Sequence, residues 1–423
     1  MSIRILRGAI LSAAAAATIL AQQSPVLTTL HTFAGSPNDG AWPYAGVVVG
    51  IDGVLYGTTN IGGTAGSQGF GTAFSLTPPK SPGGSWTEDV LWNFGNASDD
   101  GINPVGLTLA SSGVFYGATS IGGTRQHGTV FSLTPPAAPR GDWTEAIVHS
   151  FYGGDDGDSP QAGPTIGPGG LLYGTTYFGG FPEPNGTVYA LEPPAEAPPG
   201  VIHFFAGGDD GAYPTAPVAA GSGGVLYGTT SYGGTAGGGT VFSMKPPDAR
   251  GGAWTETVLY QFSMGPNDSG QSAVVGIGAK GLLYGTTAYG GASSDGTVFM
   301  LQAPTTKGGN WTQTVLYTFS GSDGAYPSTG VLLGSGGQLY GTTSSGGTSG
   351  WGTVFVLNPP ASPDGVWTET VLYNFTDGAD GAKPNSLAID SKGVLYGTTV
   401  FGGTTVGGAC IELGCGTVFS LAP

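Results

Sequence analysis

The chain has 423 residues, including 82 glycines and 31 prolines, and its formal net charge is −16. Aromatic residues reach 11%, which gives enough apolar surface for folding and excludes an intrinsically disordered protein. The negative charge and the lack of a basic patch exclude nucleic acids and anionic membrane surfaces as partners. Short apolar runs between frequent glycines and prolines predict an all-β protein of many strands joined by turns.

The N-terminus has the parts of an export signal. Arg4 and Arg7 form a basic start, Ala9 to Leu20 is apolar, and Ala21 is a small residue before a polar one. The apolar run is too short to span a bilayer. We therefore expect a signal peptide over residues 1–21, and a mature protein that is secreted or lies at the cell surface without a membrane span.

A tetrapeptide, Tyr-Gly-Thr-Thr, recurs along the rest of the chain. Successive copies are 54 to 60 residues apart, and one of them reads Tyr-Gly-Ala-Thr. The copies begin at Tyr56, Tyr116, Tyr173, Tyr227, Tyr284, Tyr340 and Tyr396. A repeat of this period indicates a solenoid or a propeller, and seven copies leave no room for a second domain.

Each copy contains four strand-like segments. In the sixth copy they are residues 328–333, 338–343, 352–357 and 367–375, all rich in β-branched and aromatic residues and bounded by Gly, Pro, Asp or Asn. Four strands per repeat are typical of propeller blades.

The two ends of the repeat region complement each other. Residues 26–33 match a fourth segment that precedes the first copy, and the chain ends on a third segment, residues 416–421. Joining them completes a seventh blade and removes two exposed strand edges. The prediction is one domain over residues 22–423, a monomeric seven-bladed β-propeller closed by its N-terminal strand.

The repeat resembles known families. A Gly-Gly pair after the second strand and a Trp that opens the fourth resemble Kelch-like propellers. The sequence motifs Leu-Tyr-Gly-Thr-Thr, Gly-Gly-Thr and Gly-Thr-Val-Phe are more similar to the GloVer (Gloeobacter/Verrucomicrobia-type) tandem repeats of bacterial exported proteins, over residues 26–421. The resemblance implies an exported, extracellular or cell-surface repeat protein and little chemistry.

The connections between the fourth and first strands carry a recurring Asp-Gly-x-x-Pro. They emerge on the same face as the loops after the second strands, so the aspartates form a ring there. Its members are Asp39, Asp100, Asp156, Asp210, Asp323 and Asp380. They could focus negative potential or bind calcium, although no Asp-x-Asp-x-Asp spacing occurs. The alternative is turn structure alone, since Asp-Gly is a turn signal.

The same face carries aromatic residues that differ between the copies. They are Trp42, Tyr213 and Tyr326 before the prolines, and Tyr177, Phe178, Tyr232, Tyr289 and Phe401 after the tetrapeptides. Aromatic rings near carboxylates and amides suit saccharides, and a ligand site should break the sevenfold symmetry. The alternative is packing between blades.

Other recurring residues are expected to be structural. The tetrapeptide tyrosine should lie in the core, with its glycine allowing close approach of a neighbouring backbone. Histidines in fourth strands should be structural, and the glutamates that follow the Trp should lie on the outer surface. These glutamates are Glu88, Glu145, Glu256 and Glu369, with Gln313 in one copy.

Cys410 and Cys415 are the two cysteines of the chain. In an exported protein we expect them to form a local disulfide, since two ligands alone make a poor zinc site.

No nucleophile elbow, phosphate loop or metal motif occurs, so no catalytic residue and no cofactor is assigned. The sequence favours an extracellular binding or scaffold module for carbohydrate or a surface protein. Two alternatives stay open. One is a polysaccharide hydrolase or lyase that uses two carboxylates of the acidic face, and the other is a surface-assembly protein without a small ligand.

Overall fold

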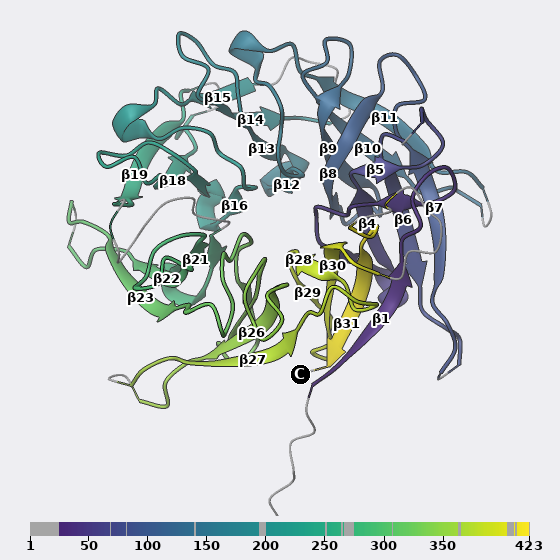
Figure 1. Ribbon diagram of the computed structural model, residues 1–423. Coiled ribbons are helices and arrows are strands. Elements are labelled where there is room, and N and C mark those ends of the chain that lie inside the picture. The colour runs from purple at the N-terminus through teal and green to yellow at the C-terminus, as the bar shows by residue number, and fades with distance from the viewer. Residues whose placement is uncertain are drawn as a thin grey trace, which may run out of the picture.

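In the computed structural model the chain forms a ring of seven β-sheets around a central axis (Figure 1). The structure describes residues 25–422 except 68, 82, 139–140, 194–199, 250–251, 264, 266–274, 307, 363–364, 404–409 and 411–412. The expected signal peptide, residues 1–21, lies outside the described residues. Within them, the helices are six single turns, and none is long and apolar enough to cross a membrane.

The seven sheets are the predicted blades, numbered here in chain order. Blade 1 is β3 (Val48–Val49), β4 (Leu55–Thr59), β6 (Thr72–Thr77) and β7 (Thr87–Asn93). Blade 2 is β8 (Gly101–Leu109), β9 (Phe115–Gly122), β10 (Thr129–Thr134) and β11 (Thr144–Ser150). Blade 3 is β12 (Thr165–Ile166), β13 (Leu172–Thr176), β14 (Thr187–Leu191) and β15 (Gly200–Phe204). Blade 4 is β16 (Ala219–Ala220), β17 (Leu226–Thr230), β18 (Thr240–Lys245) and β19 (Thr255–Gln261).

The remaining blades follow the same order from the axis outward. Blade 5 is β20 (Gly276–Ile277), β21 (Leu283–Thr287), β22 (Thr297–Gln302) and β23 (Thr312–Thr318). Blade 6 is β24 (Leu332–Leu333), β25 (Leu339–Thr343), β26 (Thr353–Asn358) and β27 (Thr368–Asn374). Blade 7 is β28 (Ala382–Pro384), β29 (Ala388–Ile389), β30 (Leu395–Phe401), β31 (Thr417–Ala422) and β1 (Val26–Thr32). Outside the blades, β2 (Gly40–Ala41) pairs with β5 (Ile61–Gly62). The single turns are η1 (Ile51–Gly53), η2 (Gly154–Asp156), η3 (Pro168–Gly170), η4 (Gly208–Asp210), η5 (Ser222–Gly224) and η6 (Ala279–Gly281).

The ring closes through its two ends, as predicted. β1 runs antiparallel to β31, from the pair Val26–Ala422 to the pair Thr32–Thr417, and Figure 1 shows the two strands side by side. The N-terminal strand thus supplies the fourth strand of blade 7. The all-β fold, the seven four-stranded blades and the closing strand are confirmed.

The core consists of aromatic pairs that join neighbouring blades. Phe33, at the end of β1, lies edge-to-face on Phe74 of blade 1 with 5.1 Å between ring centroids, and both rings are buried. Equivalent pairs join the other six boundaries: Phe94–Phe131, Phe151–Tyr189, Phe205–Phe242, Phe262–Phe299, Phe319–Phe355 and Phe375–Phe419. Such geometry adds roughly 0.5–1.5 kcal/mol per pair beyond burial of the ring area.

The tetrapeptide supports this core in a way that differs partly from expectation. Tyr56 packs between blades, 4.5 Å from Phe115 of blade 2, but it is partly exposed rather than in the core. Its neighbour Gly57 makes room for a ring rather than for a backbone, because a Cβ there would lie 2.6 Å from Phe74 Cζ. The last threonine of the motif, Thr59, shares a buried 2.8 Å hydrogen bond with Thr72 of the third strand.

Candidate functional site

The connections between blades and the loops after the second strands meet on one face. Backbone bridges join them at Asp158–Phe178, Ala212–Tyr232 and Ala325–Ser345. The aromatic residues and aspartates singled out from the sequence therefore lie on the same face of the ring.

The residue just before each connection's proline has a left-handed backbone. In the described connections its φ lies between +54° and +58°, at Trp42, Asn103, Ser159, Tyr213, Tyr326 and Lys383. Non-glycine residues are uncommon there, and bulky ones are outliers. The conformation points each backbone N–H at the preceding blade: Tyr213 N–H donates to the Asn185 carbonyl at 2.7 Å. Inter-blade hydrogen bonds thus hold a strained residue at each joint.

Three of the predicted tyrosines come together between blades 3 and 4. Tyr177 follows β13, Tyr232 follows β17, and Tyr213 lies in the connection that enters blade 4. The ring centroid of Tyr213 is 5.1 Å from that of Tyr177 and 5.9 Å from that of Tyr232. Phe178 completes the cluster at 5.8 Å from Tyr213. The pKa of Tyr177 is raised, chiefly by burial and also by the neighbouring Tyr232 and Tyr213, so its hydroxyl stays protonated.

The other predicted aromatic residues form two separate pairs. Tyr289 of blade 5 lies 5.6 Å from Tyr326, which enters blade 6. Trp42 lies 6.1 Å from Phe401 of blade 7, and its indole N–H donates to the Gly414 carbonyl at 3.1 Å. Each pair crosses a blade boundary, so these rings contribute to packing while their outer surfaces stay available; Tyr232, Tyr289 and Tyr326 are each about two-fifths exposed.

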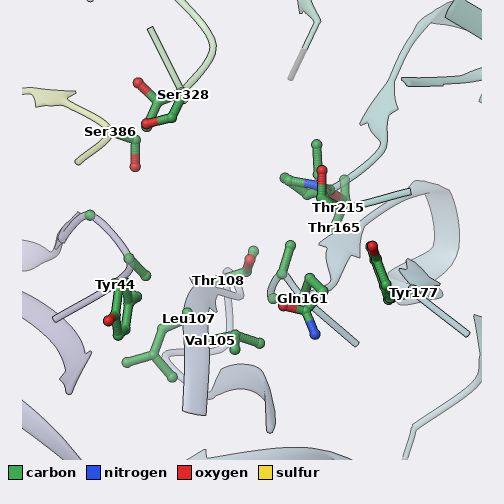
Figure 2. Close-up of a pocket in the computed structure, with 18 of the residues that line it drawn as sticks. Tyr44, Val105, Leu107, Thr108, Gln161, Thr165, Tyr177, Thr215, Ser328 and Ser386 are labelled. Atoms are coloured by element: carbon green, nitrogen blue, oxygen red, sulfur yellow. The ribbon is translucent and has the colours of Figure 1, made fainter. Parts of the chain in front are cut away.

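A cavity of about 550 Å³ opens at one end of the central channel. Tyr44, Tyr177 and Tyr232 line it, together with Gln161 and a set of small and hydroxyl-bearing residues. The hydroxyls belong to Thr108, Thr165, Thr215, Ser231, Ser328, Thr329 and Ser386. Figure 2 shows Tyr44 and Tyr177 on opposite sides of this space, with Thr108 and Gln161 between them. Among the described lining residues none carries a charge.

The aspartates of the Asp-Gly-x-x-Pro loops fold their own connections. One Asp210 oxygen accepts a 2.6 Å hydrogen bond from the Ala206 backbone N–H, and the other makes a 3.1 Å hydrogen bond with His203 Nε2. Asp39, Asp156, Asp323 and Asp380 have the same two kinds of partner, with His31, His149, Tyr317 and Tyr373 as the side chains. Asp100 accepts backbone N–H groups of Gly95 and Asn96. These contacts favour the turn interpretation of the aspartate ring, and a calcium ion would have to displace them.

The side-chain partners of the aspartates were not singled out from the sequence as a set. They do have a signal, since a His, Tyr or Trp stands two residues before the last Phe of every fourth strand. That position points back over the connection, so in five connections the polar atom of the His or Tyr reaches the aspartate six to eight residues later. Trp92, by contrast, has an Nε1 atom without a hydrogen-bond partner.

The glutamates were expected on the outer surface, and this expectation is wrong. Glu88, Glu145, Glu256 and Glu369 are half-buried against the preceding blade. The Oε1 atom of each is buried and has no hydrogen-bond partner. Burial raises the pKa of Glu145 to about 8 and that of Glu369 to about 7, and Asp100 and Asp323, respectively, add to the shift. Their recurrence on the outermost strand suggested exposure, but the neighbouring blade covers this side.

Cys410 and Cys415 form a disulfide. Both residues are buried in the cluster that contains Phe33 and Phe74, at the closing boundary of the ring.

Some solved structures are similar to this one at low sequence identity. A proposed 6-phosphogluconolactonase from Bacteroides uniformis ATCC 8492 is 14% identical, with a TM-score of 0.50 over 81% of this chain and 88% of that one. A proposed oxidoreductase (glucose dehydrogenase) from Thermus thermophilus is 13% identical, with a TM-score of 0.41 over 94% and 100%. A protein of unknown function from Dyadobacter fermentans DSM 18053 is 12% identical, with a TM-score of 0.45 over 94% and 99%. At these identities the likeness concerns the fold alone.

No curated protein sequence matches the chain. The Gloeobacter/Verrucomicrobia repeat, in contrast, matches residues 13–140, 138–308 and 277–423. Because these matches together span the whole propeller, the chain belongs to the Gloeobacter/Verrucomicrobia repeat family.

Proposed function

We propose that this protein is an exported binding module that holds an uncharged saccharide at the mouth of its central channel. The observation that carries the proposal is the cluster of Tyr177, Tyr213 and Tyr232 at the edge of a cavity lined by hydroxyls. Two of the three tyrosines line the cavity themselves.

The chemistry of the cavity supports this class of ligand. The apolar faces of sugar rings stack on aromatic side chains, and sugar hydroxyls exchange hydrogen bonds with Ser, Thr, Tyr and Gln side chains, which both donate and accept. Ligand sites combine apolar walls with a few converging polar groups. The lack of a charged side chain among the described lining residues favours a neutral saccharide over a uronic acid or a sugar phosphate.

The backbone around the cavity supports pre-organisation of the site. Tyr213 has φ +56° and is held by hydrogen bonds at its N–H and its carbonyl oxygen. Strained conformations of this kind persist only where the surroundings impose them. A ring fixed in this way loses little entropy when a ligand stacks on it.

The acidic loops give little support to a hydrolase or lyase. Glycoside hydrolysis needs two carboxyl groups on either side of a bond in an accessible cleft. Here the loop aspartates bond to their own connections, and the facing Oε1 atoms of the glutamates are shielded from solvent. Catalysis is therefore not part of the proposal.

Export is part of the proposal. The basic and apolar segments of residues 1–21 have the pattern of a signal peptide, and a buried disulfide suits an oxidising compartment. Fractionation of the producing cells tests this part: mature protein beginning near Gln22 should be found outside the cytoplasm. Full-length protein retained in the cytoplasm would contradict it.

The binding proposal is tested by a glycan array with the mature protein, followed by titration calorimetry with the best saccharide. Replacing Tyr232 with Ala should lower the affinity for that saccharide by about fivefold, since a ring contact contributes roughly 1 kcal/mol. Tyr152→Ala is the matched control, because Tyr152 is 56% exposed and lies outside the cavity lining. Equal losses in both variants, or no neutral glycan on the array, would count against the site. An array without any bound neutral glycan would favour a surface-assembly role.

A further inference from the structure

Three potential metal ligands meet where the ring closes. His31 lies on β1, Asp39 lies in the connection that follows, and Glu88 lies on β7 of blade 1. His31 Nε2 is 3.3 Å from Asp39 Oδ2, and one ligand atom of each residue lies within 4.8 Å of those of the other two. Among the described residues, this is the one group of three such side chains close enough to hold a metal ion.

The surroundings leave this group short of positive charge. Glu88 Oε1 is buried and has no hydrogen-bond partner, although it lies beside a second carboxylate. In the described part of the chain, Asp39 has an ion-pair contact with His31 alone, and Glu88 has none. A buried carboxylate oxygen is costly unless something pairs with it. A divalent cation between the three side chains would satisfy Glu88 and neutralise both carboxylates.

We propose that His31, Asp39 and Glu88 bind a divalent transition metal of the zinc type. One imidazole nitrogen and two carboxylate oxygens form a ligand set that zinc accepts, with water as a fourth ligand. Calcium and magnesium prefer oxygen ligands alone. The bound ion would cross-link the closing strand β1 to β7 of the next blade, so the metal would act as a structural clasp on the ring.

The boundary between blades 3 and 4 holds His203, Asp210 and Glu256 at the same places, but their ligand atoms do not all lie within 4.8 Å of one another. Two other boundaries supply natural comparisons. Between blades 5 and 6 the same places hold Tyr317, Asp323 and Glu369, and the Tyr317 hydroxyl donates to Asp323 at 2.6 Å. A protonated tyrosine hydroxyl can donate the hydrogen bond that the histidine makes, but it does not supply the metal-binding nitrogen. Elsewhere Gln313 takes the place of the glutamate, as its pairing with Leu301 matches that of Glu88 with Leu76. The fold therefore already accommodates both His31→Tyr and Glu88→Gln.

The test is zinc titration of the tag-free mature protein after chelator treatment, followed by calorimetry. The disulfide removes both cysteines as competing thiolates. The parent should bind Zn²⁺ in preference to Ca²⁺ and Mg²⁺. His31→Tyr and Glu88→Gln should each lower the affinity for one zinc equivalent by roughly 100-fold or more. Even the loss of an outer-shell partner lowers metal affinity 10–100-fold. Glu369→Gln, the matched control, should bind like the parent.

A second readout concerns stability. Zinc should raise the melting temperature of the parent and of Glu369→Gln, because an ion that binds the folded chain stabilises it, and this rise should disappear in His31→Tyr. The proposed metal site would be overturned if the parent did not bind zinc. It would also be overturned if both variants bound zinc with the stoichiometry and affinity of the parent. Since the tyrosine cluster of the proposed saccharide site lies between blades 3 and 4, the glycan titration of Tyr232→Ala stays independent of this result.

Discussion

The backbone N–H of Trp42 donates a 2.9 Å hydrogen bond to the carbonyl oxygen of Cys415. The first connection of the ring is thereby tied to the last loop of the chain. The same bond recurs at the other described boundaries, for example from Asn103 to Phe70 and from Lys383 to Trp351. The left-handed residue before each proline is therefore a joint between blades, and its side chain differs from one boundary to the next.

The strain at these joints can be measured at Lys383, which is exposed and has φ +54°. Lys383→Val should lower the free energy of unfolding by about 1–2 kcal/mol, because a β-branched side chain clashes in the left-handed region. Lys383→Gly loses the same side-chain contacts but fits that region, and it should stay close to the parent. Urea unfolding of the three proteins measures the difference, and equal stability of the two variants would show that the backbone is unstrained.

Ring closure can be tested by removing β1. A chain without residues 26–34 should aggregate or lose stability clearly, since β31 would be left with unpaired backbone groups at an open edge. A chain that begins at residue 25 keeps β1 and should melt like the parent. If the shorter chain stays monomeric in size-exclusion chromatography and keeps its melting temperature, the terminal strand does not close the ring.

Much of the fold could be read from the sequence because the repeat shows which residues are equivalent. Seven tetrapeptides fix the number of blades, and the match of residues 26–33 to a fourth strand gives the closure. The burial of Glu145 could not be read in this way. It recurs with the repeat on the outermost strand of its blade, and only the packing of the neighbouring blade buries its Oε1 atom.

The site was predicted only in part. Aromatic residues that broke the sevenfold symmetry did identify Tyr177, Tyr213 and Tyr232, which meet in space. Tyr44 and Gln161 were missed, although they follow the prolines directly, because their approach to the cavity depends on the path of the short inner strands. The aspartates had a turn signal from the start, but their His and Tyr partners become evident only when the strands are aligned.

Loss of the disulfide should have a modest effect. Replacing both Cys410 and Cys415 with Ser should lower stability by about 2 kcal/mol, because the loop they close is short and its closure restricts the unfolded chain little. The variant should remain folded, as the neighbouring contact between Trp42 and Cys415 uses the backbone. Thermal melts under oxidising conditions measure the loss. A thiol titration that finds two free thiols in exported parent protein would contradict the bond itself.

The buried glutamates predict that stability falls as pH rises. Burial raises the pKa of Glu145 to about 8, and the carboxylates of Asp100 and Asp99 contribute to the rise. In the unfolded chain this group has its ordinary pKa near 4.5. The folded state therefore binds the proton more tightly than the unfolded state does. Its contribution is fully present below about pH 4.5 and is lost progressively as pH rises to about 8.

The variant Glu145→Gln isolates this contribution, and Gln313 shows that an amide fits at the equivalent position. Near pH 5 the parent carries a neutral carboxyl group, so the two proteins should have similar melting temperatures. Near pH 9 the parent must keep a buried carboxylate beside Asp100, whereas the variant holds a neutral amide. The melting temperature of the variant, measured relative to the parent, should therefore rise between these pH values. A difference that does not change with pH would mean that Glu145 is already ionised throughout the range and is reached by solvent in the folded ring.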